Sequence, residues 1–583
     1  MSVFRQPEWD NFVRVTGQHP RSWPGYAWEL SGLVWRRLAN VLRMKLSGSD
    51  HRGLKSSPEW LVAEDIGRNP ARGGGMSFPS HPNVTQRLPP NPADEMQFAA
   101  ADPEGYLFRH RWGNCFAAAL DDKAAAEAAL AHALSWIRNP PARSDAAWEP
   151  YSSCERVVNL AVMLSVHPGC RREVETRYEN EISQFLADSI AWIGNRLEYY
   201  GMARTNNHIL NNARALVVAG SVLGDEAALE RGLLLFDRMA QVLFLPEGFL
   251  RERSSHYQCV VANWLLDALH FATAANPAQG RAQRAMANLN ALSARVSRAT
   301  ALLVRASEGM NTQIGDISPD CTPAAAISRI RCLYPEALAG PDGNANWRHD
   351  EWLSVSDGKH RLLSCGLPEN YPFEYTTHGH PDLCGFIWAL GGNPVLVDAG
   401  RAGYLDTPGN RRQAGPEGHN VLTVQGLPPL AESLLTSGRW CPRPYAQAKV
   451  RIEHRSESGF LIEHDGFGRI SGVGRHARSI LIDGDGISVQ DRIDGTGIVD
   501  VEMFWHFAPG LAPLGDSAVA GRGMQFDVRL GGSDRGAARL RWEEYPFSAA
   551  YGDVQQAYML RVTRTTSLPW LGTTTLRATQ CAA

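Results

Sequence analysis

The sequence predicts a multidomain α+β protein with a helical N-terminal part and an antiparallel β-sandwich in its C-terminal part. At 583 residues the chain is too long for one ordinary hydrophobic core, so two or more domains are expected. From about residue 100 to residue 335 the chain has helical character. Beyond Pro341 the pattern changes to short alternating segments between turns, which is typical of an antiparallel sandwich.

The helical part opens with residues 124–137, a run of strong helix formers that Asn139-Pro140-Pro141 terminates. Further helices are expected in series, joined by short turns as in successive antiparallel helices. Their predicted ranges are 157–165, 173–197, 206–223, 226–243, 256–274 and 282–306.

The C-terminal part contains short runs in which apolar and polar residues alternate, such as 459–463, 478–483 and 486–491. Asp-Gly and Gly-Thr-Gly turns separate them, as strands of an antiparallel sheet require. The change of pattern near residue 340 predicts three regions along the chain. These are an irregular, partly helical extension (1–100), a helical domain (101–338) and a β domain (339–583).

Composition limits the classes of function. Hydrophobic residues make up 44% and charged residues 20%, as in a folded globular protein. The net charge of −3 predicts neither nucleic-acid binding nor membrane attraction, so an anionic ligand must meet a local basic patch. Seventeen tryptophans suit a carbohydrate cleft with stacking platforms, although helix–helix cores explain any one of them equally well.

The cysteines and the N-terminus give further expectations. Ten cysteines without Cys-x-x-Cys spacing predict neither a thiolate zinc site nor a disulfide scaffold. The first residues have no basic segment before an apolar core, and no run is long enough to cross a membrane. The sequence as given therefore predicts a cytoplasmic protein, or a periplasmic one if an export leader has been removed.

The most informative stretch runs from His378 to Asn420. Within it, His380, Asp398 and His419 offer two imidazoles and a carboxylate, a suitable N/N/O set for zinc. His378 precedes His380 by two residues, so on an extended strand both side chains leave by the same face. The pattern predicts an uncommitted imidazole beside a metal. The alternative is a set of unrelated polar residues around turns.

The helical part has its own polar constellation. Residues 205–212 open a helix, with Thr205 as the expected N-cap. Asn207 and His208 each have an asparagine four residues further along the same helix face. Four asparagines in seven positions are poor helix formers, so propensity alone would not select them. A cluster of capping and turn residues is the alternative.

A second polar segment, residues 248–258, lies directly before an apolar helix and ends in Tyr257 and Gln258. Tyr257 followed by Val261 and Leu265 also fits a plain apolar stripe. A third segment, 313–320, is a turn that either orients a neighbouring group or serves only as a loop.

Together these segments resemble the heparinase II/III-like polysaccharide lyases, including relatives that act on alginate. The resemblance covers roughly residues 100–510 and rests on motifs in family order: Asn-Asn-His, Glu-Arg-Ser-x-x-Tyr, His-x-His-x-Asp, Asp-x-Gly and His-Asn. It implies that the helical domain is an (α/α) toroid, an incomplete helical barrel, placed before the β-sandwich.

The resemblance also implies roles for matching residues. Asn207 and His208 resemble the pair that binds and neutralises the substrate carboxylate. Tyr257 resembles the acid/base tyrosine, and His378 the catalytic histidine from the β domain. The zinc implied by the family is structural, with His380, Asp398 and His419 as its ligands. Further substrate-binding candidates are Asn206, Arg251, Glu252, Arg253, His256 and Tyr404.

One departure concerns the residue after the tyrosine. Some family members carry Tyr-His where this chain has Tyr257-Gln258, and here the histidine lies one position earlier, at His256. One position turns a side chain by about 100° around a helix, so His256 need not replace the family histidine.

The implied activity is β-elimination at a 4-linked uronic acid, with an anionic polysaccharide or oligosaccharide as the partner. Neither nucleic acid nor membrane insertion is expected, and a homodimer is left open. A glycoside hydrolase is one alternative, because Glu155, Glu252 and Asp316 offer carboxyl groups. A catalytically weak glycan-binding protein of polysaccharide biosynthesis is the other.

Overall fold

The computed structural model describes residues 75–82, 110–113, 123–199, 205–277, 280–310, 312–319, 321–339, 345–366, 378–405, 407–429, 435–436, 439–440, 448–456, 458–532 and 538–580. The extension expected over residues 1–100 therefore lies outside the described residues, apart from 75–82. Among the described helices, none combines the length and apolar character that crossing a membrane requires.

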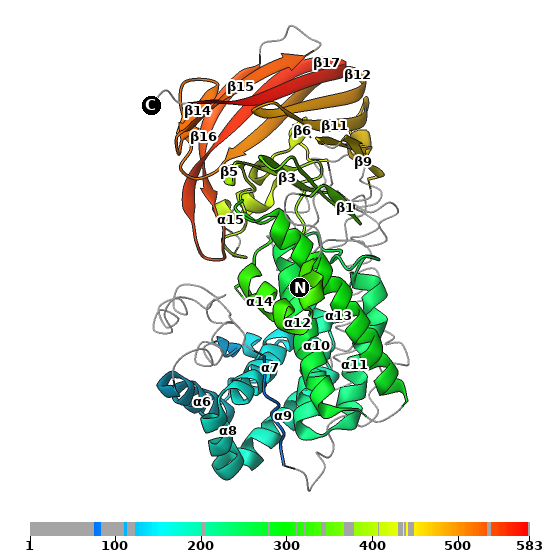
Figure 1. Ribbon diagram of the computed structural model, residues 1–583, viewed down its shortest axis with the longest axis vertical. Helices are drawn as coiled ribbons and strands as arrows, with labels where there is room; N and C mark the ends of the chain where they lie inside the picture. The colour runs from blue at the N-terminus through cyan, green and yellow to red at the C-terminus, as the bar shows by residue number, and fades with distance from the viewer. Residues whose placement is uncertain are drawn as a thin grey trace, which may run out of the picture.

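The prediction of a helical region followed by a large antiparallel sheet is confirmed, and Figure 1 shows the two stacked along the long axis of the molecule. The helical region ends with η5 (Pro335–Ala339), and the first strand begins at Trp347. The other described helices of this region are α6 (Lys123–Arg138), η3 (Ala146–Trp148), α7 (Pro150–Val166), α8 (Pro168–Glu173), η4 (Val174–Tyr178), α9 (Glu179–Gly194), α10 (His208–Leu223), α11 (Glu226–Leu243), α12 (Ser255–Ala275), α13 (Arg281–Ala306) and α14 (Pro323–Leu333).

Three details of the helices differ from the prediction. The helix expected over 173–197 is divided, because the π-helical η4 precedes α9. Helix α14 was not expected from the sequence. Thr205 is not the N-cap of α10, because the helix begins at His208 with Asn207 in the capping position. The side chain of Asn207 makes no capping hydrogen bond, so it remains available for another task.

Helix α10 is the centre of the helical region and packs against α7, α9, α11 and α12. It ends at Gly224, whose φ of 68° closes the helix in the left-handed conformation. Asp225 then caps α11 by accepting a hydrogen bond from the Ala228 amide. A Cβ at Gly232 would lie 2.7 Å from the Ala213 carbonyl oxygen, so this glycine allows α10 and α11 to approach closely.

The sheet is built around a long antiparallel pair, β12 (Gly486–Phe507) and β17 (Gln555–Gln580). Strand β11 (Val473–Asp483) pairs with β12, and β15 (Met524–Gly532) and β16 (Arg539–Phe547) pair with β17. The remaining described strands are β1 (Trp347–His349), β2 (Trp352–Ser356), β3 (His360–Cys365), β4 (Phe386–Leu390), β5 (Asn393–Leu396), β6 (Leu422–Val424), β7 (Leu435–Thr436), β8 (Arg439–Trp440), β9 (Val450–Ser456), β10 (Gly459–His464), β13 (Ala512–Pro513) and β14 (Ala518–Gly521).

An apolar cluster joins the helical region to the sheet. Phe249, in the turn before α12, stacks on Trp347 and Trp352 of β1 and β2, with ring centroids 6.3 and 6.4 Å apart. Leu303 of α13 and Ile387 of β4 belong to the same buried cluster. This contact fixes one region against the other, and the predicted site residues lie along the same junction.

Candidate active site

The junction brings together two predicted residues from different regions. Tyr257 lies in the first turn of α12, where its amide donates to the side chain of the N-cap residue Ser254 at 2.9 Å. His378 comes from the segment before β4. The rings of Tyr257 and His378 are stacked, with centroids 3.5 Å apart and planes inclined by 12°. The helical region and the sheet therefore each supply one titratable ring to the same place.

Tyr404 joins this pair through its hydroxyl group. The hydroxyl oxygens of Tyr257 and Tyr404 are 2.9 Å apart, and the Tyr404 hydroxyl donates to the Ile317 carbonyl at 3.0 Å. The Tyr404 hydroxyl has one proton, and it points to the Ile317 carbonyl. In the hydrogen bond between the two hydroxyls, Tyr257 is therefore the donor and Tyr404 the acceptor. Burial raises the pKa of Tyr404 well above its usual value, and Asp316 and Tyr257 add to the rise, although 37% of the residue's surface is exposed. Tyr404 therefore remains a neutral phenol.

Asp316 connects the two histidines of the His-x-His motif. Its carboxylate lies 3.1 Å from His378 Nδ1 and 2.9 Å from His380 Nε2. Burial alone would raise the pKa of Asp316, but Arg401 and the two histidine hydrogen bonds lower it. An ionised Asp316 accepts a hydrogen bond from one N–H group of each ring, which leaves the ring lone pairs on His378 Nε2 and His380 Nδ1.

The turn around Asp316 is fixed by backbone contacts as well. The Asp316 amide donates to the His378 carbonyl at 2.9 Å. Gly315 has a φ of 81°, and a Cβ there would lie 2.8 Å from the same carbonyl oxygen, so a glycine is required for this close approach. The turn that the sequence offered either as an orienting element or as a loop thus contacts the His378 segment directly.

The three predicted metal ligands lie together. His380, Asp398 and His419 are buried, and one potential ligand atom from each lies within 4.8 Å of the others. Asp398 Oδ2 is 2.7 Å from His419 Nδ1. His380 Nδ1 and His419 Nε2 are buried without a hydrogen-bond partner among the described residues. Two orphaned imidazole nitrogens and a carboxylate are a donor set that fits zinc.

The Asn-Asn-His segment lies at the start of α10. Glu252 accepts a hydrogen bond from the backbone amide of Asn207 at 2.8 Å, and its other carboxylate oxygen lies 3.6 Å from His378 Nε2. Glu252 thus links the start of α10 to the stacked rings. The side-chain amide of Asn207 is fully buried, yet neither of its atoms has a hydrogen-bond partner among the described residues. An unsatisfied buried amide is costly, so this one is a candidate for binding a ligand.

His208 follows Asn207 and is paired with a carboxylate. Its Nδ1 lies 2.8 Å from Glu198, and its ring packs against Tyr151 with centroids 4.8 Å apart. Burial alone would lower the pKa of His208, but the charge and hydrogen bond of Glu198 raise it, with further contributions from Glu149 and Glu252. About a third of the side chain (34%) is exposed, so an imidazole with a raised pKa is accessible to a ligand.

Arg253 extends from the turn before α12 into the β region. It forms a buried ion pair with Asp382 at 2.6 Å and donates to the His380 carbonyl at 3.2 Å. Its φ of 57° places it in the left-handed region. Arg253 therefore links the helical region to the segment that carries the His-x-His motif.

The remaining candidates lie around these groups. Asn206 accepts a hydrogen bond from the His208 amide at 3.2 Å. His256 is buried, with its ring centroid 6.3 Å from that of Tyr257. Arg251 is half-buried, and its amide donates to the Leu243 carbonyl at 2.9 Å. Gln258 donates to the Gly248 carbonyl at 3.1 Å and accepts from the Leu250 amide at 2.7 Å.

Some functional groups carry little signal in the sequence. Glu198, which faces His208, stands in no segment that suggested a role. Asp382, which pairs with Arg253, ends the His-x-His-x-Asp motif, but the motif gave it no role of its own. Asp316 was considered only as part of a turn and as a hydrolase carboxylate. Glu155, another hydrolase candidate, is held by a buried salt bridge to Arg214 at 2.9 Å.

Comparison with known proteins supplies an independent finding. Residues 362–577 match the family model "Heparinase II/III-like, C-terminal". The structure of heparinase III is similar over 79% of this chain and 74% of that chain, with a TM-score of 0.60 and 13% identity. The heparan sulfate lyase HepC from Pedobacter heparinus is similar over 99% and 93%, with a TM-score of 0.54 and 14% identity. No curated protein sequence matches the chain. At these identities the structural likeness shows a shared fold.

Proposed function

We propose that this chain is a heparinase II/III-like lyase, which cleaves a uronic-acid-containing polysaccharide by β-elimination. Its residues 362–577 match the family model, and its fold is similar to that of heparinase III. The observation that carries the proposal is the buried side-chain amide of Asn207, which has no hydrogen-bond partner among the described residues and lies beside His208, whose pKa is raised. The same fold comparison supports an (α/α) toroid for the helical region.

The role of Asn207 and His208 follows from the chemistry of the substrate. Elimination removes the proton at C5 of a uronic acid, and this proton is only weakly acidic while the adjacent carboxylate stays charged. The side-chain amide of Asn207 donates a hydrogen bond to that carboxylate, and the His208 imidazolium supplies a positive charge. Both stabilise the negative charge that develops as the proton leaves.

Tyr257 and His378 are the acid and base of the reaction. Either Tyr257 or His378 takes the C5 proton, and the same or the other group protonates the leaving oxygen at C4. Asp316 holds the Nδ1 proton of His378, which leaves Nε2 free to accept one. Tyr257 already donates to Tyr404, so its hydroxyl has a defined direction at the stacked pair.

A zinc ion fits the group of His380, Asp398 and His419. When bound, it supplies a structural cross-link between the His-x-His segment and the turns after β5 and before β6. Asp316 orients both histidine rings through hydrogen bonds. It accepts one from His380 Nε2, the ring nitrogen that would not bind the metal, and one from His378 Nδ1. Bracing of this kind keeps the His378 ring against Tyr257.

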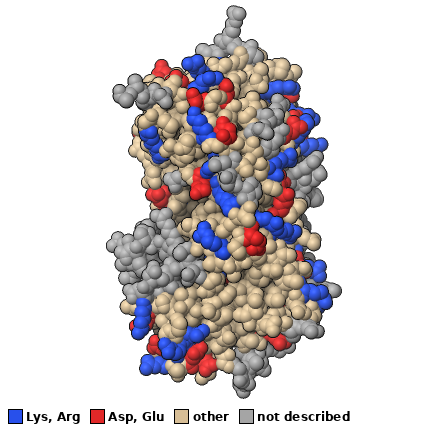
Figure 2. All heavy atoms as spheres, in the orientation of Figure 1, with Lys and Arg blue, Asp and Glu red and all other residues tan. Residues whose placement is uncertain are grey.

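A glycosaminoglycan is the substrate class that the similar structures suggest, since their names are heparinase III and heparan sulfate lyase. On the face shown in Figure 2, basic and acidic side chains are interspersed, and much of the helical region carries few charges. With a net charge of −3, the protein would recognise such a polyanion through local groups such as His208 rather than through a general positive field.

The proposal is tested by ultraviolet absorbance of the unsaturated uronate end that elimination creates. The protein is incubated with heparan sulfate, heparin, hyaluronan, chondroitin, alginate and bacterial exopolysaccharides. A rise in absorbance with one of them is expected. New reducing ends without that absorbance would instead identify a hydrolase, and glycan binding without any cleavage would identify a binding protein.

The pH dependence of cleavage is expected to move when Glu198 is replaced by glutamine. His208 is cationic below its raised pKa and loses its charge as the pH rises through that value, so kcat/KM falls on the alkaline side. In Glu198→Gln the burial of His208 remains but the main raising group is lost. The alkaline fall should therefore occur at lower pH. Glu149→Gln should cause a smaller shift, and an unchanged profile in Glu198→Gln would remove His208 from this role.

Metal removal is expected to destabilise the protein. A ligand present at about 1,000 times its Kd stabilises a fold by roughly 4 kcal/mol, so chelation should lower the unfolding midpoint and zinc should restore it. In His419→Ala the midpoint should already be low and should respond little to the chelator. Purified protein without zinc, whose unfolding is insensitive to chelation, would contradict the three-ligand site.

A further inference from the structure

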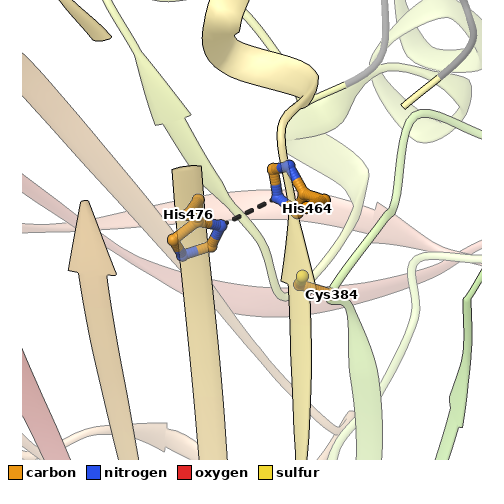
Figure 3. A group of neighbouring side chains, drawn as sticks. All are labelled: Cys384, His464 and His476. Carbon is orange, nitrogen blue, oxygen red and sulfur yellow. Dashed lines mark hydrogen bonds between the residues drawn. The ribbon is translucent and has the colours of Figure 1, made fainter. Parts of the chain in front are cut away.

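A second group of metal-binding side chains lies in the β region, away from the stacked rings. Cys384 precedes β4, His464 ends β10 and His476 lies on β11 (Figure 3). The antiparallel register of β10 and β11 places His464 directly opposite His476. All three side chains are buried, and one donor atom of each lies within 4.8 Å of the others. A cysteine and two histidines that follow it by 80 and 92 positions thus present a sulfur and two imidazole nitrogens to one another.

The thiol is held in place by an unusual backbone. Cys384 has a φ of 69°, a left-handed conformation that non-glycine residues rarely adopt. Arg478 of β11 donates to the Cys384 carbonyl at 3.2 Å and binds Asp491 of β12 through two nitrogens, at 2.7 and 3.0 Å. Strained residues of this kind persist where the surroundings fix them, and they concentrate at functional positions.

Hydrogen bonds fix which ring nitrogen of each histidine carries the proton. Asp491 lies 2.8 Å from His476 Nε2, so that nitrogen carries the proton and His476 Nδ1 keeps a lone pair. This lone pair faces His464 Nε2 at 2.9 Å, the contact drawn in Figure 3. A carboxylate on the far nitrogen is the usual support of a metal-binding histidine. The Phe467 ring lies 5.4 and 5.7 Å from the rings of His464 and His476 and adds an apolar wall.

We propose that Cys384 Sγ, His464 Nε2 and His476 Nδ1 form a second metal site, which takes a thiophilic d¹⁰ cation, Zn²⁺ or Cu⁺. Thiolate and imidazole donors select these ions over Mg²⁺ and Ca²⁺. Binding replaces the Cys384 thiol proton, which is released to solvent. The His464 proton moves from Nε2 to Nδ1, at the cost of the hydrogen bond that Nδ1 accepts from the Gly466 amide at 3.1 Å. No electron transfer is involved.

The position of this site suggests what it stabilises. Cys384 follows His380 by four residues, so the segment carrying the His-x-His motif would be tied down at both ends. One end is the group of His380, Asp398 and His419, and the other is the group of Cys384, His464 and His476. The second group contains no residue of the proposed acid–base machinery. The inference therefore stands independently of the proposed lyase activity.

The test uses Co²⁺ as a spectroscopic probe on the full-length protein after metal removal. A cobalt ion bound by a thiolate shows a sulfur-to-metal charge-transfer absorption in the near ultraviolet, which the His380 group, having no sulfur, cannot give. Two bound equivalents are expected, one of them with this absorption. Elemental analysis of the protein as purified distinguishes zinc from copper, and either one at Cys384 agrees with the proposal.

Variants assign the absorption to its site. Cys384→Ser should lose the charge-transfer band and one equivalent of metal. Cys170→Ser, which changes another buried thiol on α8, should keep both. His419→Ala should lose the other equivalent and keep the band. A wild-type protein that binds cobalt without a charge-transfer band, or whose band survives in Cys384→Ser, overturns the proposal; the first of these outcomes needs no variant to fold.

Discussion

Replacing Tyr257 with phenylalanine is expected to reduce kcat by about 10²–10⁴-fold, the range that a positioned proton-transfer group contributes. Only the hydroxyl group is lost, and the ring would still stack on His378. The fold should therefore be retained, since no apolar contact of the ring disappears. Steady-state rates from the absorbance of the unsaturated product, on whichever polymer the wild type cleaves, provide the measurement.

Tyr404→Phe is the matched control for this prediction. Its hydroxyl accepts from Tyr257 and donates to the Ile317 carbonyl, so its removal leaves the Tyr257 hydroxyl present but without its acceptor. The loss of one such hydrogen bond should lower kcat by about tenfold or less. Equal losses in the two variants would indicate that the pair acts as one unit. Full activity in Tyr257→Phe would exclude it from proton transfer.

The second large effect is expected at the ion pair between the two regions. Arg253→Met leaves Asp382 buried without its cation, and breaking a buried pair in this way costs about 3–5 kcal/mol. Burial alone would raise the pKa of Asp382, but nearby positive groups lower it, with Arg253 ahead of His419 and His380. A lower unfolding midpoint is therefore expected, measured by thermal or denaturant unfolding.

Two further variants distinguish loss of the ion pair from a nonspecific loss of stability. Removing both partners, in Arg253→Met with Asp382→Leu, should recover part of the loss, because no uncompensated charge remains. Arg138→Met disrupts a surface pair with Glu181 and should leave the midpoint unchanged. If Arg253→Met were as stable as the wild type, the pair would not be the link between the regions.

The sequence by itself determined the order of the architecture and most of the helices. Helical runs such as 226–243 are set by local propensity and by a capping residue, here Asp225, within a few positions of the chain. Family motifs also identified the candidate residues Asn207, Tyr257 and His378. The N-cap prediction for Thr205 was wrong because the chain has several residues able to cap within three positions, and local rules do not choose among them.

Only the tertiary structure decided which distant groups meet. Tyr257 stacks on His378, Asp316 joins His378 to His380, and Glu198 raises the pKa of His208. Cysteine spacing gave no thiolate site, yet strand register and the Cys384 turn bring a thiol beside two histidines. Sequence patterns report interactions over a few residues, whereas hydrogen bonds and ligand sets depend on through-space distances that only the folded arrangement of helices and strands establishes.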